Sequence, residues 1–159
     1  ENFGCGIENI CNALIEISEK NDLEIVYPVH LNPNIKSTVE KKLKNRDNIH
    51  LIKPMNYPTF IWMMSKANII LTDSGGVQEE APSLGIPVLV MRDTTERPEG
   101  IDAKTSILVG TDSNKIVLTT NKLLNEKTFY EEISNKENPY GDGKASDRIL
   151  NFFNGKIND

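Results

Sequence analysis

The stretch Leu71-Thr72-Asp73-Ser74-Gly75-Gly76-Val77-Gln78-Glu79-Glu80-Ala81-Pro82 decides how this chain folds. The apolar run 67–71 ends here in a polar corner with two glycines, and a helical stretch follows it. This layout is typical of a strand that feeds a helix in an α/β fold. Because Gly75 and Gly76 have no Cβ, a ligand can approach their backbone closely. Free N–H groups and the positive end of the helix dipole then favour a phosphate group.

Two side chains beside this corner extend the phosphate prediction to a nucleotide. Ser74, at or next to the helix N-cap, adds a hydroxyl donor. Glu80 lies about one turn into the helix, where its carboxylate can accept both hydroxyls of a ribose. A Ser-Gly-Gly corner also serves as an ordinary turn and cap, so this segment alone leaves both interpretations open. Neither the Walker A pattern nor the G-x-G-x-x-G dinucleotide spacing is present.

Composition indicates one globular domain and narrows the classes of partner. The 159 residues are 38% hydrophobic and 26% charged, which suits a single domain with an ordinary core. The net charge of −5 and the lack of a basic stripe argue against nucleic acid, and the basic cluster 36–46 predicts a solvated helix face. No apolar run approaches the ~20 residues of a membrane span. Cys5 and Cys11 lie on one predicted helix, so we expect no disulfide and a cytoplasmic protein.

Strand and helix patterns alternate along the chain. Strands are predicted at 24–30, 49–53, 67–72, 87–91 and 106–109. Helices are predicted from about 7 to a break at 21–22, at 35–44, 58–66, 76–84, after a cap at 112 or 113, at 128–134, and finally with Ala145, Ile149, Phe152 and Phe153 on one face. This alternation predicts an α/β fold with a three-layer, Rossmann-like parallel sheet. Ligands bind beyond the carboxyl ends of such strands, so segments 27–34, 72–76 and 92–100 should open onto one crevice.

The segment 92–100 carries five charges in nine residues directly after a predicted buried strand. As a structural feature it is a solvated loop, and we expect a long charged loop over 92–104. At the strand end, however, one of its arginines can neutralise a diphosphate with forked donors. Arg97 is favoured for this role, since Arg92 sits close enough to the strand to pair with Asp93 or a helix end.

Other candidate positions have a structural and a functional interpretation each. His30, at a strand end, either caps local backbone or contacts a ligand in the crevice. Backbone groups of the loop 55–60 suit a flat base edge, whereas Phe60 and Trp62 are predicted core residues. Lys144 is a surface lysine or a cation at the cleft. Two separated histidines predict no metal site, and no nucleophile and base are paired, so the chain resembles a binding half without a reaction centre.

Five segments together resemble the non-hydrolysing UDP-N-acetylglucosamine 2-epimerases of bacteria and archaea. They are ENFG (1–4), YPVHLNP (27–33), LTDSGGVQEEAPSLGIPVLVMRDTTERPEG (71–100), LVGTD (108–112) and NPYGDGKAS (138–146). The match runs through essentially the whole chain in the right order, and 72–100 is its most specific part. The resemblance implies one UDP-binding domain over 1–159, the C-terminal half of a GT-B-like enzyme. The N-terminal domain, with the catalytic carboxylates, and the first strand of this domain are then absent from the chain.

The resemblance also implies a reaction and a set of contacts. The family interconverts UDP-GlcNAc and UDP-ManNAc by elimination and re-addition of UDP, without a cofactor. By motif match, Ser74, Gly75 and Gly76 contact the diphosphate, Glu80 holds the ribose, and Arg97 contributes to the nucleotide site. Met55 and Phe60 contact the uracil. His30 lines the cleft, near a second, regulatory UDP-sugar site that some members have. We expect a cytoplasmic homodimer that serves polysaccharide biosynthesis, and no activity from this chain alone.

Two other readings stay open at this point. The first is the donor-binding half of a GT-B glycosyltransferase, which also holds ribose with a glutamate beside glycine-rich turns. The second is a non-catalytic UDP-sugar sensor. The segment 92–100 matches the epimerases better than the transferases, and the intact binding residues oppose a loss of ligand.

Overall fold

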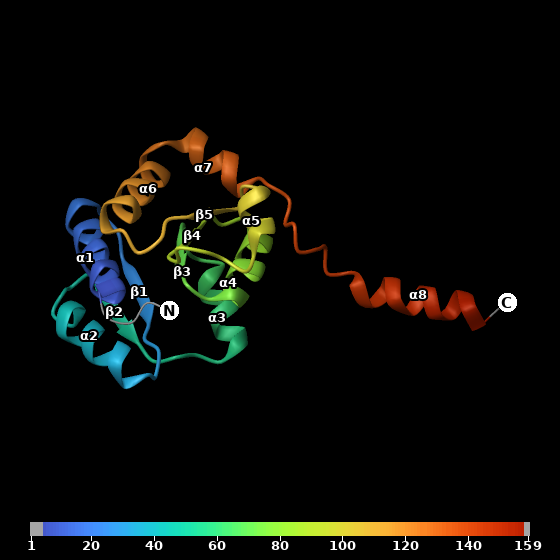
Figure 1. Ribbon diagram of the computed structural model, residues 1–159, viewed down its shortest axis with the longest axis horizontal. Helices are drawn as coiled ribbons and strands as arrows, with labels where there is room; N and C mark the ends of the chain where they lie inside the picture. The colour runs from blue at the N-terminus through green and yellow to red at the C-terminus, as the bar shows by residue number, and fades with distance from the viewer. Residues whose placement is uncertain (1–4, 158–159) are drawn as a thin grey trace.

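The computed structural model describes residues 5–157, with side chains through residue 155; the ENFG segment of the resemblance lies outside the described residues. Five short strands alternate with helices, as Figure 1 shows. The strands are β1 (Ile25–Pro28), β2 (Ile49–Ile52), β3 (Ile70–Thr72), β4 (Val88–Val90) and β5 (Ser106–Leu108). The helices are α1 (Cys5–Lys20), α2 (Pro33–Leu43), α3 (Tyr57–Met64), α4 (Gly75–Glu80) with its 3₁₀ continuation η1 (Ala81–Leu84), α5 (Pro98–Asp102), α6 (Ser113–Asn125), α7 (Lys127–Ser134) and α8 (Ala145–Ile157).

All strand pairs are parallel, which confirms the predicted α/β class. The strands do not form one continuous sheet, however. Among the described residues β1 pairs with β2, and β3, β4 and β5 form a second sheet in that order. The edge of β1 away from β2 and the edge of β3 away from β4 therefore have no partner strand among these residues.

The side chains of β4 explain the three layers. Leu89 faces a core cluster built from α1, α2, α6 and α7, whereas Val88 and Val90 face a second cluster with residues of α3, α4 and α5. Side chains alternate across a strand, so one strand supplies both cores. All three residues are fully buried. The continuous apolar pattern of β4 is the one expected for a strand covered on both faces.

Helix α1 bridges the two sheets. It packs against α2, beside β1 and β2, and against α6, which follows β5. One face of α1 is buried, with Ile10 and Cys11 in the first core. Burial raises the pKa of the Cys11 thiol to about 11, so Cys11 is a protonated packing residue. Cys5 is exposed, and both cysteines are free.

Two predicted elements differ in detail from the structure. The long charged loop predicted over 92–104 is wrong in part, because α5 forms within it; Pro98 sits in the first turn, where its fixed φ favours a helix. The helix predicted over 76–84 tightens into the 3₁₀ turn η1, because Pro82 has no N–H for continued α-helical bonding. It ends, as predicted, at Gly85, whose φ of 69° is left-handed.

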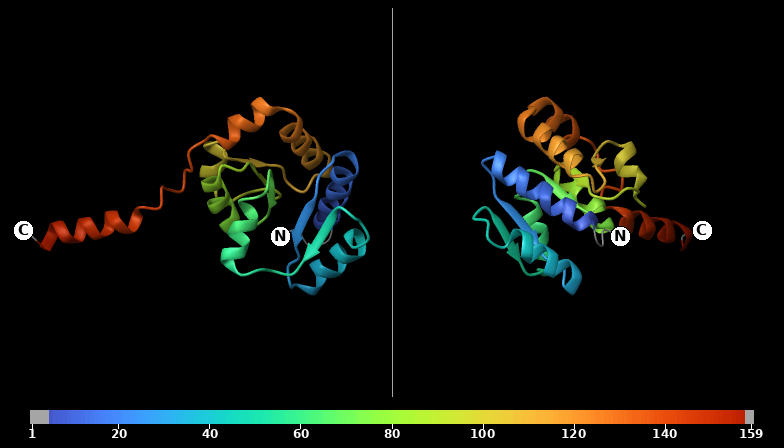
Figure 2. Two further views of the ribbon diagram at one scale, coloured as in Figure 1. Left: turned by 180° about the vertical axis from the view of Figure 1, so that it is seen from behind. Right: turned by 60° about the vertical axis from the view of Figure 1, so that its left-hand side comes forward.

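Helix α8 extends away from the rest of the molecule (Figures 1 and 2). Its predicted apolar face exists but is uncovered: Ile149, Leu150, Phe152 and Phe153 are each more than half exposed. Arg148 holds the preceding turn by two bonds to the Asp142 carboxylate, at 2.7 and 2.9 Å. In the part of the chain described, no helix has the length and hydropathy needed to cross a membrane.

Candidate functional site

The polar corner between β3 and α4 keeps its side-chain hydroxyl uncommitted. Ser74 occupies the N-cap position of α4, but its side chain makes no cap hydrogen bond. Its backbone N–H donates to Thr72 Oγ1 at 3.0 Å instead, which fixes the turn. Ser74 is exposed, so its hydroxyl faces solvent at the start of a helix. The corner is thus a turn that lacks the side-chain cap of the ordinary interpretation.

The fold itself does not require the two glycines. Neither Gly75 nor Gly76 has a positive φ. A Cβ on Gly75 would lie 3.5 Å from Arg97 Nη2, and one on Gly76 would lie 4.0 Å from Ser74 Oγ, both ordinary distances. Glycine in a helix is less favourable than alanine by up to ~1 kcal/mol. Neither packing nor backbone conformation therefore requires glycine at these two positions.

Arg97 lies beside this corner. Its guanidinium Cζ is 3.6 Å from the position of a Gly75 Cβ. Its Nε donates to Glu79 Oε1, and its Nη1 lies 3.5 Å from Glu96 Oε2. The hydrogen bond to Glu79, and then the charge of Glu79, raise the pKa of Arg97. Arg92, the alternative arginine, is largely buried and pairs with Glu96 at 3.8 Å.

Glu80 is brought together with the start of α3. Its Oε1 accepts a hydrogen bond from Tyr57 Oη at 3.2 Å. Desolvation, followed by the negative charge of Glu80, raises the pKa of Tyr57, so the phenol keeps its proton and remains a donor at neutral pH. The predicted base loop 55–60 therefore lies beside the predicted ribose acceptor. No local sequence pattern indicates a role for Tyr57.

The aromatic residues of α3 face in different directions. Phe60 is half-buried and packs against the cluster that contains Val77 and Val88, as expected for a core residue. The prediction that Trp62 is a core residue is wrong: it is 61% exposed, because Ile61 and Met64 turn the inner face of α3 away from it. Met55 is half-buried in the preceding loop.

His30 and Lys144 lie apart from the contacts described so far. His30 is exposed, and its Nδ1 accepts the backbone N–H of Asn32 at 3.1 Å. That bond supports the interpretation that His30 caps local backbone. Contact of His30 with a ligand stays a prediction. Lys144 is exposed, in the loop before α8.

A second set of residues, which no local sequence pattern reveals, holds the segment that carries Arg97. Tyr140 Oη accepts the backbone N–H of Gly100 at 3.0 Å and donates to the carbonyl of Arg97 at 3.2 Å. Asn138 Nδ2 donates to Ser83 Oγ at 2.5 Å, at the end of η1. The loop 138–146 was singled out as a turn-rich motif, but no local pattern reveals a partner 40 residues away.

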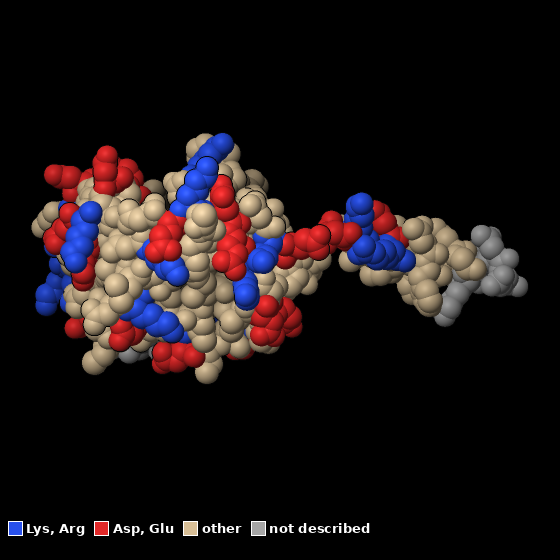
Figure 3. Space-filling view, turned by 90° about the horizontal axis from the view of Figure 1, so that it is seen from above, with Lys and Arg blue, Asp and Glu red and all other residues tan. Residues whose placement is uncertain are grey.

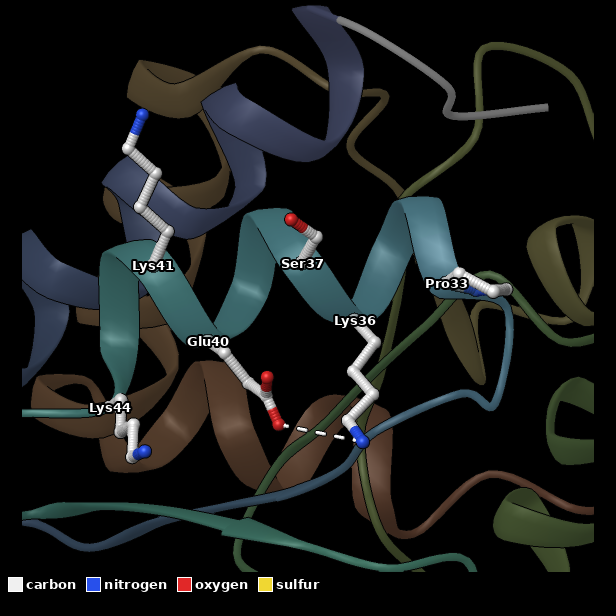
Figure 4. Close-up of a pocket in the computed structure, with 6 residues that line it drawn as sticks. All are labelled: Pro33, Lys36, Ser37, Glu40, Lys41 and Lys44. Atoms are coloured by element: carbon white, nitrogen blue, oxygen red, sulfur yellow. Dashed lines mark ion pairs between the residues drawn. The ribbon is translucent and has the colours of Figure 1, made fainter.

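One face of the molecule carries mixed charge. On the face drawn in Figure 3, acidic and basic side chains interleave without a broad region of one sign. Figure 4 shows a shallow hollow on the outer face of α2, lined by Pro33, Lys36, Ser37, Glu40, Lys41 and Lys44. Lys36 pairs with Glu40 there at 3.8 Å, which fits the predicted solvated face. Within residues 5–157 no three His, Cys, Asp or Glu side chains gather as metal ligands.

The family model and the curated relatives that match this chain carry the same description. The family model described as UDP-N-acetylglucosamine 2-epimerase matches residues 1–154. A UDP-N-acetylglucosamine 2-epimerase of Yersinia pestis is 57% identical over 151 residues, which is 94% of this chain and 40% of that protein. The chain thus spans about two fifths of the length of the curated relatives it matches.

Two solved structures share the fold closely. The Neisseria meningitidis UDP-GlcNAc 2-epimerase bound to UDP-GlcNAc is 47% identical, with a TM-score of 0.91 over 96% of this chain and 41% of its own. An S. aureus MnaA structure with UDP is 43% identical, also with a TM-score of 0.91, over 99% of this chain and 43% of its own. The parallel α/β arrangement described above is therefore the arrangement of these proteins.

Proposed function

The chain belongs to the UDP-N-acetylglucosamine 2-epimerase family, and from that premise we propose that it is the UDP-binding domain of such an enzyme. The whole enzyme interconverts UDP-GlcNAc and UDP-ManNAc, and the product serves polysaccharide biosynthesis. The proposal rests on one observation above all. The Arg97 guanidinium lies against Gly75 at a helix start whose Ser74 hydroxyl makes no cap bond.

Each part of the nucleotide has a matching group at this site. The diphosphate lies between Arg97 and the N–H groups of Gly75 and Gly76, with the Ser74 hydroxyl as a further donor. The ribose hydroxyls donate to the carboxylate of Glu80. The Tyr57 hydroxyl, which donates to Glu80 Oε1 at 3.2 Å, holds that carboxylate in place.

The uracil lies against the loop that precedes α3 and the first residues of that helix. Met55 and Phe60 supply the apolar contacts, and the loop backbone pairs with the edge of the base. His30 lines the same cleft from the end of β1, close to a second, regulatory site for a UDP-sugar. The half-buried positions of Met55 and Phe60 leave part of each side chain available for contact.

The site acts on the leaving group of the reaction. During elimination a base removes the proton from C2 of the sugar, the C1–O bond breaks, and UDP departs with the electron pair. Preorganised N–H groups and a guanidinium stabilise the negative charge that develops on the departing diphosphate. Re-addition of UDP to C1 and of a proton to the other face of C2 gives the epimer. The proton-handling carboxylates belong to the N-terminal domain, so the 159-residue chain alone is inactive.

The same proposal accounts for the divided sheet. In the whole enzyme a strand of preceding sequence lies between β1 and β3 and pairs with both, which makes one central sheet. Support comes from the two strand edges that have no partner among the described residues, and from α1, which spans the two sheets. We propose a cytoplasmic homodimer, in which the two free cysteines fit a reducing compartment.

Proton NMR of UDP-GlcNAc in heavy water tests the proposed activity. The full-length enzyme should convert the substrate to UDP-ManNAc and introduce solvent deuterium at C2. Transfer of the sugar to an added acceptor, without deuterium at C2, would identify a glycosyltransferase instead. Tight UDP-sugar binding with neither reaction would identify a sensor.

A further inference from the structure

Gln78 is a buried polar side chain for which the nucleotide contacts provide no role. It lies in the middle of α4 and is 1% exposed. A buried amide that lacks hydrogen-bond partners is costly, so its partners identify its purpose. Gln78 Oε1 accepts from Thr95 Oγ1 at 2.6 Å, and Gln78 Nε2 donates to the Ser74 carbonyl at 3.4 Å. One side chain therefore contacts the corner and the Arg97 segment at once.

The direction of each hydrogen bond in this set is determined. The Ser74 carbonyl only accepts, so the amide nitrogen of Gln78 must face it and the amide oxygen must face Thr95. The Thr95 hydroxyl gives its single proton to that oxygen. Its lone pair is left to accept the backbone N–H of Arg97, at 3.1 Å. The bonds run in sequence from the Ser74 carbonyl through Gln78 and Thr95 to the backbone of Arg97.

We propose that Gln78 and Thr95 are positioning residues, which set the backbone of Arg97 at a fixed place relative to the Ser74–Gly76 corner. This inference rests on the proposed function, since it concerns the same diphosphate site. The Arg97 guanidinium and the corner amides must grip one diphosphate together, and an error of a fraction of an ångström weakens bidentate contacts. Gln78 and Thr95 touch neither ligand nor reacting atoms in this scheme.

A series of variants at Thr95 separates positioning from structural support. Thr95→Val keeps the shape of the side chain but removes the hydroxyl, whereas Thr95→Ser keeps the hydroxyl. Thr94→Val is the matched control, because Thr94 is exposed and lies outside this set of bonds. Calorimetry on the full-length protein gives the affinity of each variant for UDP and for uridine, and urea unfolding checks that each is folded.

Thr95→Val should lower UDP affinity about five- to tenfold, the usual worth of one hydrogen bond to a buried group, and leave uridine affinity unchanged. Thr95→Ser should return UDP affinity to within about twofold of the parent, and Thr94→Val should match the parent. In an Arg97→Ala background, Thr95→Val should cause no further loss, because the residue it positions is gone.

Two results would overturn the inference. Equal losses for UDP and uridine in Thr95→Val would mean general damage to the domain. A loss of UDP affinity that persists in the Arg97→Ala background would mean that Thr95 acts independently of Arg97. Failure of the proposed function has a different signature: the parent protein would bind UDP no better than uridine, and Arg97→Ala would change neither affinity.

Discussion

Gly76 stands at a helix start whose backbone an alanine adopts equally well, and beyond the adjoining backbone the nearest atom to an added methyl group is Ser74 Oγ, at 4.0 Å. A substitution at such a residue changes ligand binding without lowering the stability of the fold. Substitutions of Arg97 and Glu80 are useful in the same way, because both residues are half-buried at the surface and each already has a protein partner. At the residue scale, the proposed function is therefore best tested by substitutions that leave the protein folded.

Gly76→Ala should leave the free energy of unfolding unchanged or raise it by up to ~1 kcal/mol, since alanine favours the helix. The same methyl group fills the space that a diphosphate needs, so UDP affinity should fall at least about tenfold. Urea unfolding and calorimetry measure the two effects. Gly155→Ala, in exposed α8 with nothing within 4 Å, is the control for a glycine change without ligand contact. Unaltered UDP binding by the Gly76 variant would remove the corner from the site.

Tyr57→Phe should reduce the preference for UDP over dTDP about two- to fivefold, because Glu80 loses the partner that holds its carboxylate toward a 2′-hydroxyl. Competition binding with the two nucleotides measures the preference. Trp62→Phe alters an exposed aromatic residue of the same helix and should leave the preference intact. If the parent protein binds UDP and dTDP equally, Glu80 does not read the 2′-hydroxyl.

At the scale of elements, the loop 138–146 acts as a clamp on the turn that carries Arg97. Tyr140 accepts from one end of that turn and donates to the other, and a Cβ on Gly100 would lie only 2.9 Å from its hydroxyl oxygen. Gly100 is thus required by the clamp, unlike the glycines of the corner. Desolvation is the main cause that raises the pKa of Tyr140, so its phenol stays protonated at neutral pH.

Tyr140→Phe removes both hydrogen bonds of the clamp and should cost about 1–2 kcal/mol of unfolding free energy. It should also weaken UDP binding more than uridine binding, since the Arg97 turn is released. Urea unfolding with parallel calorimetry provides both values. Tyr130→Phe is the matched control, because Tyr130 belongs to α7 and packs against the first core. A clamp variant as stable as the control would contradict this role.

Local patterns predicted most elements because each depends on local physics. The stripe of α1, the apolar run of β4 and the stop at Gly85 follow from periodicity, burial and backbone preference. Helix α5 was missed, because the charges of segment 92–100 hide a five-residue helix that starts at a proline. Long-range bonds, such as that between Gln78 and Thr95, leave no local pattern, so the sequence analysis found the corner and Arg97 but not what connects them.

At the scale of the whole molecule, the described chain consists of a two-core body and a projecting helix. The α/β class of the body could be predicted from the sequence. The division of its strands into two sheets could not, because it depends on which strand edges pair in the folded chain. Helix α8 was predicted from its apolar spacing, and that spacing does not reveal whether the face is covered. Phe152 and Phe153 contact each other edge to face, with ring centroids 5.7 Å apart, and remain more than half exposed.

In the 159-residue chain, Phe153→Asp should change the unfolding free energy by less than ~0.5 kcal/mol, because the ring is 57% exposed on a helix apart from both cores. Leu89→Ala, at a fully buried position of β4, should cost about 2–5 kcal/mol. Urea unfolding compares the two. A large loss in the Phe153 variant would show that α8 folds back onto the body in solution.

The ion pair between Arg97 and Glu79 means that the guanidinium already has an internal counter-ion before any nucleotide arrives. An incoming anion must displace the Glu79 carboxylate from Arg97. Chloride, which has one charge and cannot form paired hydrogen bonds with the guanidinium, competes poorly with that carboxylate. We expect UDP to displace Glu79 where chloride does not, so Glu79→Gln should make UDP affinity more sensitive to sodium chloride. By pairing with Arg97, the Glu79 carboxylate would then keep chloride from occupying the place that the diphosphate needs.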